Sequence, residues 1–96
     1  MKIKKETLII RKEAFEIMLK IKPFEFTGLC SAAKRTLDRN HRKAFMTVLK
    51  NYASSKGLNS KSDYCWRKND WPPRQRWMRR ELDKINIKLE AYDVHD

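Results

Sequence analysis

The residues best suited to chemistry in this chain lie between Tyr64 and Arg80. This segment holds all three tryptophans and interleaves them with six arginine and lysine residues. Nucleic-acid bases stack on aromatic rings, and the planar guanidinium group of arginine fits phosphate oxygens. The pattern therefore predicts a surface that binds nucleic acid or another phosphate-rich ligand. Its anion-binding residues would be Arg67, Lys68, Arg74, Arg76, Arg79 and Arg80, and its stacking or interface residues would be Trp66 and Trp71.

The tryptophans also have a structural interpretation, which the sequence leaves open. Trp71 and Trp77 could cover the core of a small domain instead of meeting a ligand. Arg76 and Arg80 share one helix face because they are four residues apart. We therefore expect Arg76, Arg79 and Arg80, in preference to any tryptophan, to bind the ligand. The Arg76→Ala and Arg80→Ala double variant should then lose affinity but still fold.

A second basic group lies nearer the N-terminus and bridges two expected helices. The short turn between these helices, at residues 38–40, resembles the connection of helix-turn-helix DNA-binding proteins. Basic residues at the start of a helix are equally expected on an ordinary solvated surface, so both interpretations stand. The group consists of Lys34, Arg35, Arg39, Arg42 and Lys43, of which Arg42 and Lys43 join the predicted anion-binding residues.

The charge distribution favours the middle of the chain. The 96 residues include 23 Lys and Arg against 12 Asp and Glu, which gives a net charge of +11. Residues 41–62 carry five basic and no acidic residues, and residues 63–80 carry six and two, whereas residues 81–96 carry two and five. An anionic partner, either nucleic acid or an acidic host protein, would therefore meet residues 41–80 first.

Catalysis and metal binding have little support in the residue types. The chain contains no CxxC or HxxxH pair, and its two glycines cannot build a glycine-rich phosphate loop. His41 lies near Asp38 but has no nucleophile at a matching spacing. Cys30 falls on an apolar helix face, which favours a buried residue over a reactive one. We therefore predict a protein that is not an enzyme and uses no metal or cofactor.

The sequence also predicts a cytoplasmic location without membrane binding. Two cysteines, Cys30 and Cys65, are too few and too far apart for a disulfide scaffold. The N-terminal residues lack the apolar region of a signal peptide, and no stretch reaches the roughly 18 apolar residues that cross a bilayer. The oligomeric state and a pairing of the two cysteines are left open.

The candidate binding residues are expected to be held mainly by helices, because apolar side chains recur at helical spacing along most of the chain. The pattern predicts helices over 6–21, over 28–37 with Thr27 as its cap, from Asp38 or Asn40 to a stop at Gly57, and over 73–91. A long connection over 58–71 joins the last two. The nearest candidates for strands are 2–10 and 63–66. We expect one all-α domain spanning 1–96, a small bundle of three to four helices.

The expected core follows the same spacing. Leu82→Ala is expected to cost roughly 2–5 kcal/mol, as for other buried leucines. The predicted apolar faces are Ile10, Ala14, Ile17, Met18 and Ile21; Phe26, Cys30, Ala33 and Leu37; Phe45, Val48, Leu49 and Tyr52; and Met78, Leu82, Ile85, Leu89 and Tyr92.

A layout of spaced small and aromatic residues covers about positions 24–85. Its parts are Phe26-Thr27-Gly28-Leu29-Cys30, Tyr64-Cys65-Trp66, Asp70-Trp71, Arg74 and Trp77. This layout resembles small accessory proteins of tailed bacteriophages, which are early, host-interacting proteins of mostly unassigned function. The resemblance implies a protein of the host cytoplasm that binds and redirects a host component. It adds an alternative function, an inhibitor or adaptor of a host protein in host takeover or counter-defence, including capture of a nucleotide signal.

Overall fold

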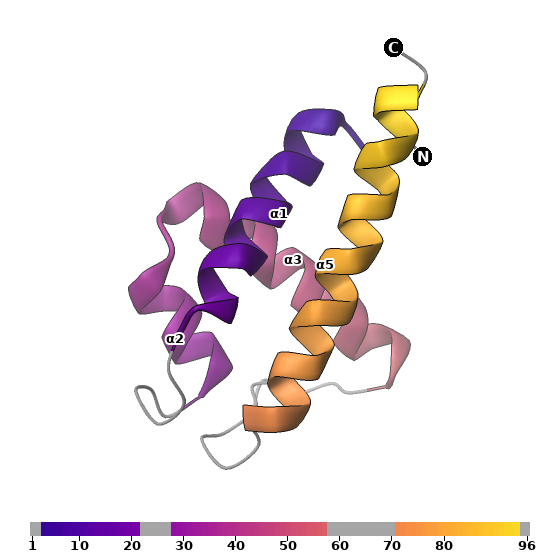
Figure 1. Ribbon diagram of the computed structural model, residues 1–96. Coiled ribbons are helices and arrows are strands. Elements are labelled where there is room, and N and C mark those ends of the chain that lie inside the picture. Colours follow the sequence, from indigo (N-terminus) through magenta and orange to yellow (C-terminus); the bar gives the residue numbers. More distant parts are fainter. Residues whose placement is uncertain (1–2, 22–27, 58–70, 95–96) are drawn as a thin grey trace.

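The computed structural model describes residues 3–21, 28–57 and 71–94, and the side chains of the last range from Pro73 to Tyr92 (Figure 1). These residues form α1 (Lys5–Leu19), α2 (Leu29–Thr36), α3 (Arg39–Ser55) and α5 (Trp71–Val94). The ranges described contain no β-strand, and the predicted all-α class is confirmed. The strand candidate over 2–10 is wrong, since α1 occupies most of it, and the candidate over 63–66 lies outside the described residues.

Local capping residues set the ends of the helices. Asp38 is the N-cap of α3, because its side chain accepts a hydrogen bond from the backbone N of His41 at 2.9 Å. Gly57 follows α3 with a φ of 73°, a left-handed conformation that favours glycine and ends the helix. The N-cap of α2 is Gly28, one residue after the predicted Thr27, which itself lies outside the described residues.

The central element of the fold is α1. Both α3 and α5 pack along it, and α2 packs against α1 and α3. Figure 1 shows α5 beside α1, with α3 crossing behind them. The backbones of α3 and α5 have little contact with each other. The hydroxyl of Tyr92 donates a hydrogen bond to the backbone oxygen of Ile3, which fastens the last turns of α5 to the residues before α1.

An aromatic cluster centred on Trp77 joins three of the helices. The Trp77 ring lies 5.5 Å from the ring of Phe15, 6.0 Å from that of Phe45 and 5.4 Å from that of Tyr52, measured between centroids. Only 2% of Trp77 is exposed. The core role that the sequence allowed for Trp77 is therefore confirmed, whereas the side chain of Trp71 lies outside the described part.

The buried face of α1 differs from the predicted one. Ile17 was expected in the core, but it is 38% exposed. The buried residues of this helix are Leu8, Ala14, Phe15 and Met18. Because α3 and α5 both contact α1, the buried stripe extends to Phe15 and leaves Ile17 at its edge.

The apolar face of α5 is buried to different depths. Met78 and Ile85 are buried, whereas Leu82 packs against the core only partly covered. Truncating Leu82 should therefore cost less than the roughly 2–5 kcal/mol that a fully buried leucine loses. That larger cost applies instead to Leu49 on α3, which is fully buried.

Candidate nucleic-acid interface

Three of the predicted anion-binding residues lie on the outer face of α5. Arg76, Arg79 and Arg80 are exposed, on the opposite side of the helix from the buried residues Trp77 and Ile85. They follow one another within about one turn and a half, so their guanidinium groups form one basic surface. This surface is accessible to a phosphate or a carboxylate of a partner.

Arg74 does not belong to this surface, which corrects the predicted set. Its side chain is 0% exposed and is among the largest fully buried side chains of the protein. The physical reason is its spacing from Trp77, because residues three apart on a helix share a face and Trp77 fixes that face in the core. A ligand on the outer surface of α5 therefore cannot reach Arg74.

The aromatic part of the predicted site lies outside the described residues. Trp66, Arg67 and Lys68 belong to this part of the chain, and the side chain of Trp71 is likewise not described. Base stacking on Trp66 or Trp71 therefore stays a prediction.

A longer basic surface runs along α3. Arg39, Lys43 and Lys50 are exposed, and their spacings of four and seven residues place them on one face of the helix. We call these three residues the α3 stripe. At a rise of about 1.5 Å per residue, the stripe extends over about 16 Å. Lys43 was predicted as a ligand contact and Arg39 was placed in the second basic group. Lys50 was not among the predicted contacts, although its heptad spacing from Lys43 is visible in the sequence.

Arg42, also predicted to bind an anion, has a second role at the corner between α2 and α3. Its Nη1 donates a hydrogen bond to the backbone oxygen of Lys34 at 3.4 Å. Lys34 lies in the last turn of α2, where the carbonyl groups lack partners within the helix. Arg42 therefore helps to hold α2 against α3 and is only partly exposed.

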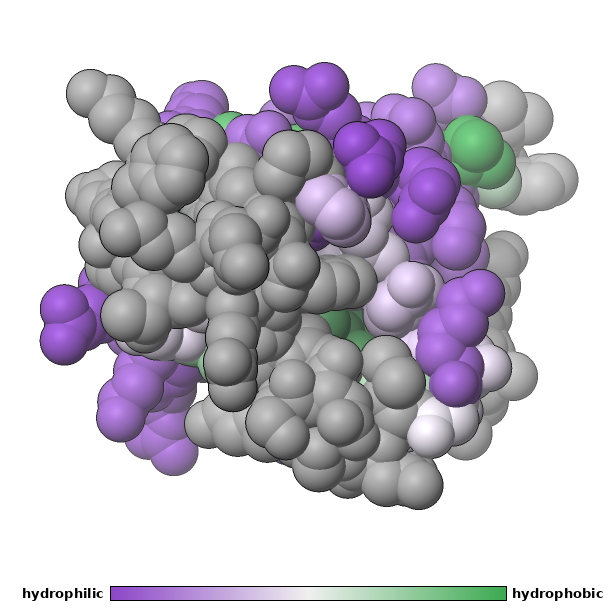
Figure 2. Space-filling view, turned by 90° about the horizontal axis from the view of Figure 1, so that it is seen from below, coloured by the Kyte–Doolittle hydropathy of each residue, from purple (hydrophilic) through white to green (hydrophobic). Residues whose placement is uncertain are grey.

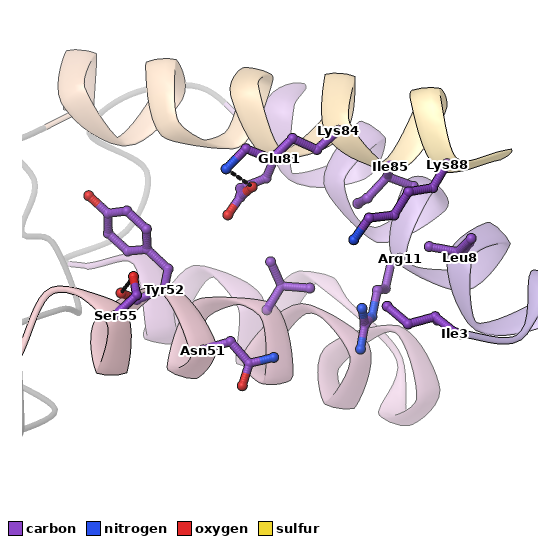
Figure 3. A pocket seen from close by; sticks show the side chains of 11 residues that line it. Ile3, Leu8, Arg11, Asn51, Tyr52, Ser55, Glu81, Lys84, Ile85 and Lys88 are labelled. Carbon is purple, nitrogen blue, oxygen red and sulfur yellow. Dashed lines mark hydrogen bonds and ion pairs between the residues drawn. The ribbon is translucent and has the colours of Figure 1, made fainter. Parts of the chain in front are cut away.

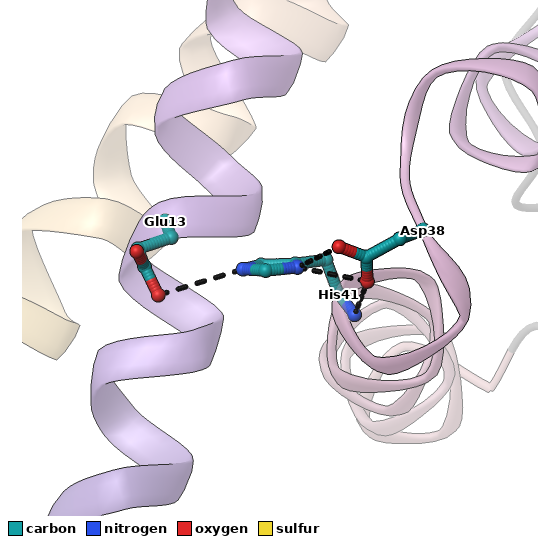
Figure 4. A network of polar contacts seen from close by, with 3 residues as sticks. All are labelled: Glu13, Asp38 and His41. Atoms are coloured by element: carbon teal, nitrogen blue, oxygen red, sulfur yellow. Dashed lines mark hydrogen bonds and ion pairs between the residues drawn. The ribbon is translucent and has the colours of Figure 1, made fainter.

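His41 connects the start of α3 to the central helix (Figure 4). Its Nδ1 lies 2.8 Å from Oδ2 of Asp38, and its Nε2 lies 3.5 Å from Oε1 of Glu13 on α1. The hydrogen bond with Asp38 raises the pKa of His41 above its usual value, against the opposing effect of burial. The backbone N–H of His41, followed by its side chain, lowers the pKa of Asp38. The two carboxylates therefore favour the protonated imidazole, and we call this arrangement the His41 clamp.

The His41 clamp should make stability depend on pH. A histidine whose pKa is raised by folding contributes its full stabilisation below the unfolded value of about 6.5, and this contribution is lost as the pH rises through the folded pKa. We expect His41→Gln to lower Tm by about 2–5 °C at pH 6, the range expected of partly exposed ion pairs in a domain of this size. The measurement is thermal denaturation of both proteins, followed by circular dichroism at pH 6, 7.5 and 9.

The difference in Tm between the wild type and His41→Gln is the quantity to compare across pH, because the overall positive charge changes with pH in both proteins. The Tm gap should shrink from pH 6 to pH 9. Glu13→Gln, which keeps the Asp38 contact, should show a smaller gap at pH 6. An equal gap at all three pH values would show that His41 acts through packing alone.

The comparisons with known proteins give no information on the function. No family model, no curated protein and no solved structure matches the chain. The resemblance to bacteriophage accessory proteins therefore stays a prediction. Among the described helices, none is both long enough and apolar enough to cross a membrane. Within the same ranges, no group of three or more His, Cys, Asp or Glu side chains is placed to hold a metal ion.

Proposed function

We propose that the protein binds nucleic acid without catalysis and that the α3 stripe makes its main phosphate contacts. The observation that carries the proposal is the imbalance of charge on α2, α3 and their flanking residues. Residues 28–57 hold seven Lys and Arg and a single acidic residue, Asp38. Asp38 is already occupied by the backbone and side chain of His41. The cations of this region are therefore not neutralised by acidic neighbours from their own helices.

The described side chains account for the whole net charge of the protein. They include 18 Lys and Arg and seven Asp and Glu, and 18 minus 7 gives the same +11 as the full sequence. The remaining side chains contain five basic and five acidic residues, so their formal charges cancel. Long-range attraction of a polyanion thus originates mainly from the described helices, which include four of the six cations of the tryptophan-rich segment.

The outer face of α3 suits phosphates better than a protein partner. Protein interfaces have an apolar or aromatic centre, whereas phosphate binding requires mainly cations and hydrogen-bond donors. The large hydrophobic residues exposed in the described part are Ile9, Ile17 and Ile87, which lie on α1 and α5. In Figure 2, which views the molecule from below, hydrophilic residues outnumber hydrophobic ones on the coloured part of the surface.

The dimensions of the α3 stripe also match a polyanion. Duplex DNA carries one negative charge per roughly 1.7 Å of its axis, so a 16 Å row of cations faces many phosphates at once. Contacts of this kind carry no sequence information, and the proposal is therefore sequence-independent binding. The surface of Arg76, Arg79 and Arg80 would add a second contact. A nucleic-acid partner agrees with the cytoplasmic location predicted from the sequence, in the host cell for a phage-encoded protein.

Salt dependence tests the proposal directly. Fluorescence polarisation with labelled duplex DNA, single-stranded DNA and RNA is measured at 50, 100 and 200 mM salt. Three to five phosphate contacts on a duplex predict that log K falls with log salt with a slope of about −3 to −4.5.

Absence of binding to all three ligands at 100 mM salt would contradict the proposal. The alternative, an inhibitor or adaptor of a host protein, would then be favoured if a purified acidic protein binds the chain after nuclease treatment. Binding to nucleic acid with a slope near zero would contradict the phosphate contacts in particular.

A further inference from the structure

A cavity between α1, α3 and α5 lies apart from the α3 stripe. It has a volume of about 320 Å³. The space exists because α3 and α5 both pack on α1 but have little backbone contact with each other. Its lining residues from the three helices include Leu8, Arg11, Val48, Ile85 and Lys88.

The cavity is lined by aliphatic side chains and by two cations, Arg11 and Lys88, which lie at the same end as Leu8 and Ile85 (Figure 3). Leu8, Val48 and Ile85 supply aliphatic side chains from three different helices. The side chains of Arg11 and Lys88 extend from α1 and α5 into the space between α3 and α5 (Figure 3). A ligand that fits this lining has an apolar body and an anionic end.

Arg11 carries a donor suited to such an anion. Its Nε is buried and has no hydrogen-bond partner among the residues that the structure describes. A buried donor without an acceptor is unfavourable, whereas a carboxylate can accept hydrogen bonds from a guanidinium group in a bidentate arrangement. Nε itself is closed to solvent, so a carboxylate in the cavity would pair with the guanidinium charge through the other nitrogens of the group.

The acidic residue in the lining does not cancel this attraction. Oε2 of Glu81 lies 3.2 Å from Nζ of Lys84, and the Glu81 side chain is only 13% exposed. Lys84 and Glu81 both line the cavity, so their charges balance each other there. The remaining charged residues of the described lining are Arg11 and Lys88, which leave a net charge of +2.

We propose that this cavity binds a small amphiphilic carboxylate, with its acid group at Arg11 and Lys88 and its aliphatic chain against Leu8, Val48 and Ile85. The volume equals that of roughly ten water molecules at about 30 Å³ each. This space suits an acid with a chain of about eight carbons, such as octanoate. The inference does not depend on nucleic-acid binding, since the α3 stripe lies on the outer face of α3.

The probes are octanoate, 1-octanol and inorganic phosphate, each titrated into the labelled full chain and followed by NMR. Octanoate should give saturable shifts of the methyl signals of Leu8, Val48 and Ile85. 1-Octanol, which lacks the charge, should bind at least about tenfold more weakly, because it cannot pair with the two cations. Inorganic phosphate should not shift these methyl signals, because it lacks the apolar body.

Two variants locate the acid group. Lys88→Gln should weaken octanoate at least about fivefold, because Lys88 is exposed at the cavity and its loss does not disturb the core. Lys20→Gln is the matched control: it removes one exposed lysine at the far end of α1, outside the cavity, and should leave octanoate affinity unchanged. Circular dichroism confirms that both variants are folded.

Equal affinities for octanoate and 1-octanol would overturn the proposal, as would an unchanged affinity of Lys88→Gln. Shifts confined to α3 stripe residues would also overturn it, because they would place the acid on the basic surface. None of these results affects the polarisation experiment with nucleic acid, so the two proposals fail independently.

Discussion

Replacing Trp77 with alanine should destabilise the fold by about 3–5 kcal/mol, the usual cost of removing a buried large aromatic side chain. Trp77 contacts Phe15 on α1 as well as Phe45 and Tyr52 on α3. Its removal would therefore leave a cavity where three helices meet. Domains of this kind are stable by only about 5–15 kcal/mol, so a large part of the total would be lost. The measurement is urea denaturation followed by circular dichroism at 222 nm, a helix signal that does not rely on tryptophan fluorescence.

Trp77→Phe provides the control for this prediction. Phenylalanine keeps an aromatic ring against Phe15 and Phe45, and it should recover more than half of the lost stability. A loss below about 1.5 kcal/mol for Trp77→Ala would contradict the central position of this residue. Equal losses for both variants would show that the indole has an essential role beyond filling space.

Removing two lysines of the α3 stripe should weaken nucleic-acid binding by about tenfold or more at 100 mM salt. Lys43→Gln combined with Lys50→Gln removes two cations that are exposed on the same face of α3. Each lost phosphate contact lowers the salt slope by about 0.9, so the slope should become less steep by about 1.8. The measurement is the polarisation assay repeated at each salt concentration.

Two other double variants serve as controls for this prediction, one on α1 and one on α5. Lys4→Gln with Lys20→Gln removes the same charge from exposed positions at the two ends of α1 and should reduce affinity less than threefold, the effect of net charge alone. Arg76→Ala with Arg80→Ala tests the surface predicted from the sequence. If only the arginine pair weakens binding, α5 carries the contacts and the α3 stripe does not.

The helices could be predicted because each is encoded by nearby residues. The third helix is the clearest case: Asp38 can cap its first turn, Gly57 can adopt the conformation that ends it, and Phe45 and Leu49 repeat at helical spacing between them. Helix caps and the spacing of apolar residues involve only a few neighbouring residues, so they can be recognised without knowledge of the rest of the fold.

The exposure of single side chains could not be predicted in the same way. Spacing shows which residues share a face, but it does not show which neighbouring helix covers that face. Ile17 satisfied the apolar pattern of α1 and nevertheless lies partly in solvent, whereas Arg74 looked like a surface cation and is buried beside the face of Trp77. Both outcomes depend on contacts between helices that are distant in the sequence.

The candidate site shows the same limit. The positive charge of the middle of the chain was visible in its composition, and Arg76, Arg79, Arg80 and Lys43 are indeed exposed. The α3 stripe was harder to recognise, because Arg39 and Lys50 gain significance only when they are seen to be exposed on the same face as Lys43. Adjacent tryptophans and arginines form a more conspicuous sequence pattern than cations separated by four and seven residues.

The His41 clamp has a consequence for the energetics of binding. It anchors the first turn of α3 to α1 through Glu13, and Arg39 and Lys43 lie two residues to either side of the anchored histidine. The backbone that presents these two cations is therefore held in place before any ligand arrives. Less conformational entropy is lost on association from a preorganised backbone than from one that must first become ordered. The clamp therefore lowers the entropic cost of binding, so that more of the electrostatic attraction to a polyanion contributes to the binding free energy.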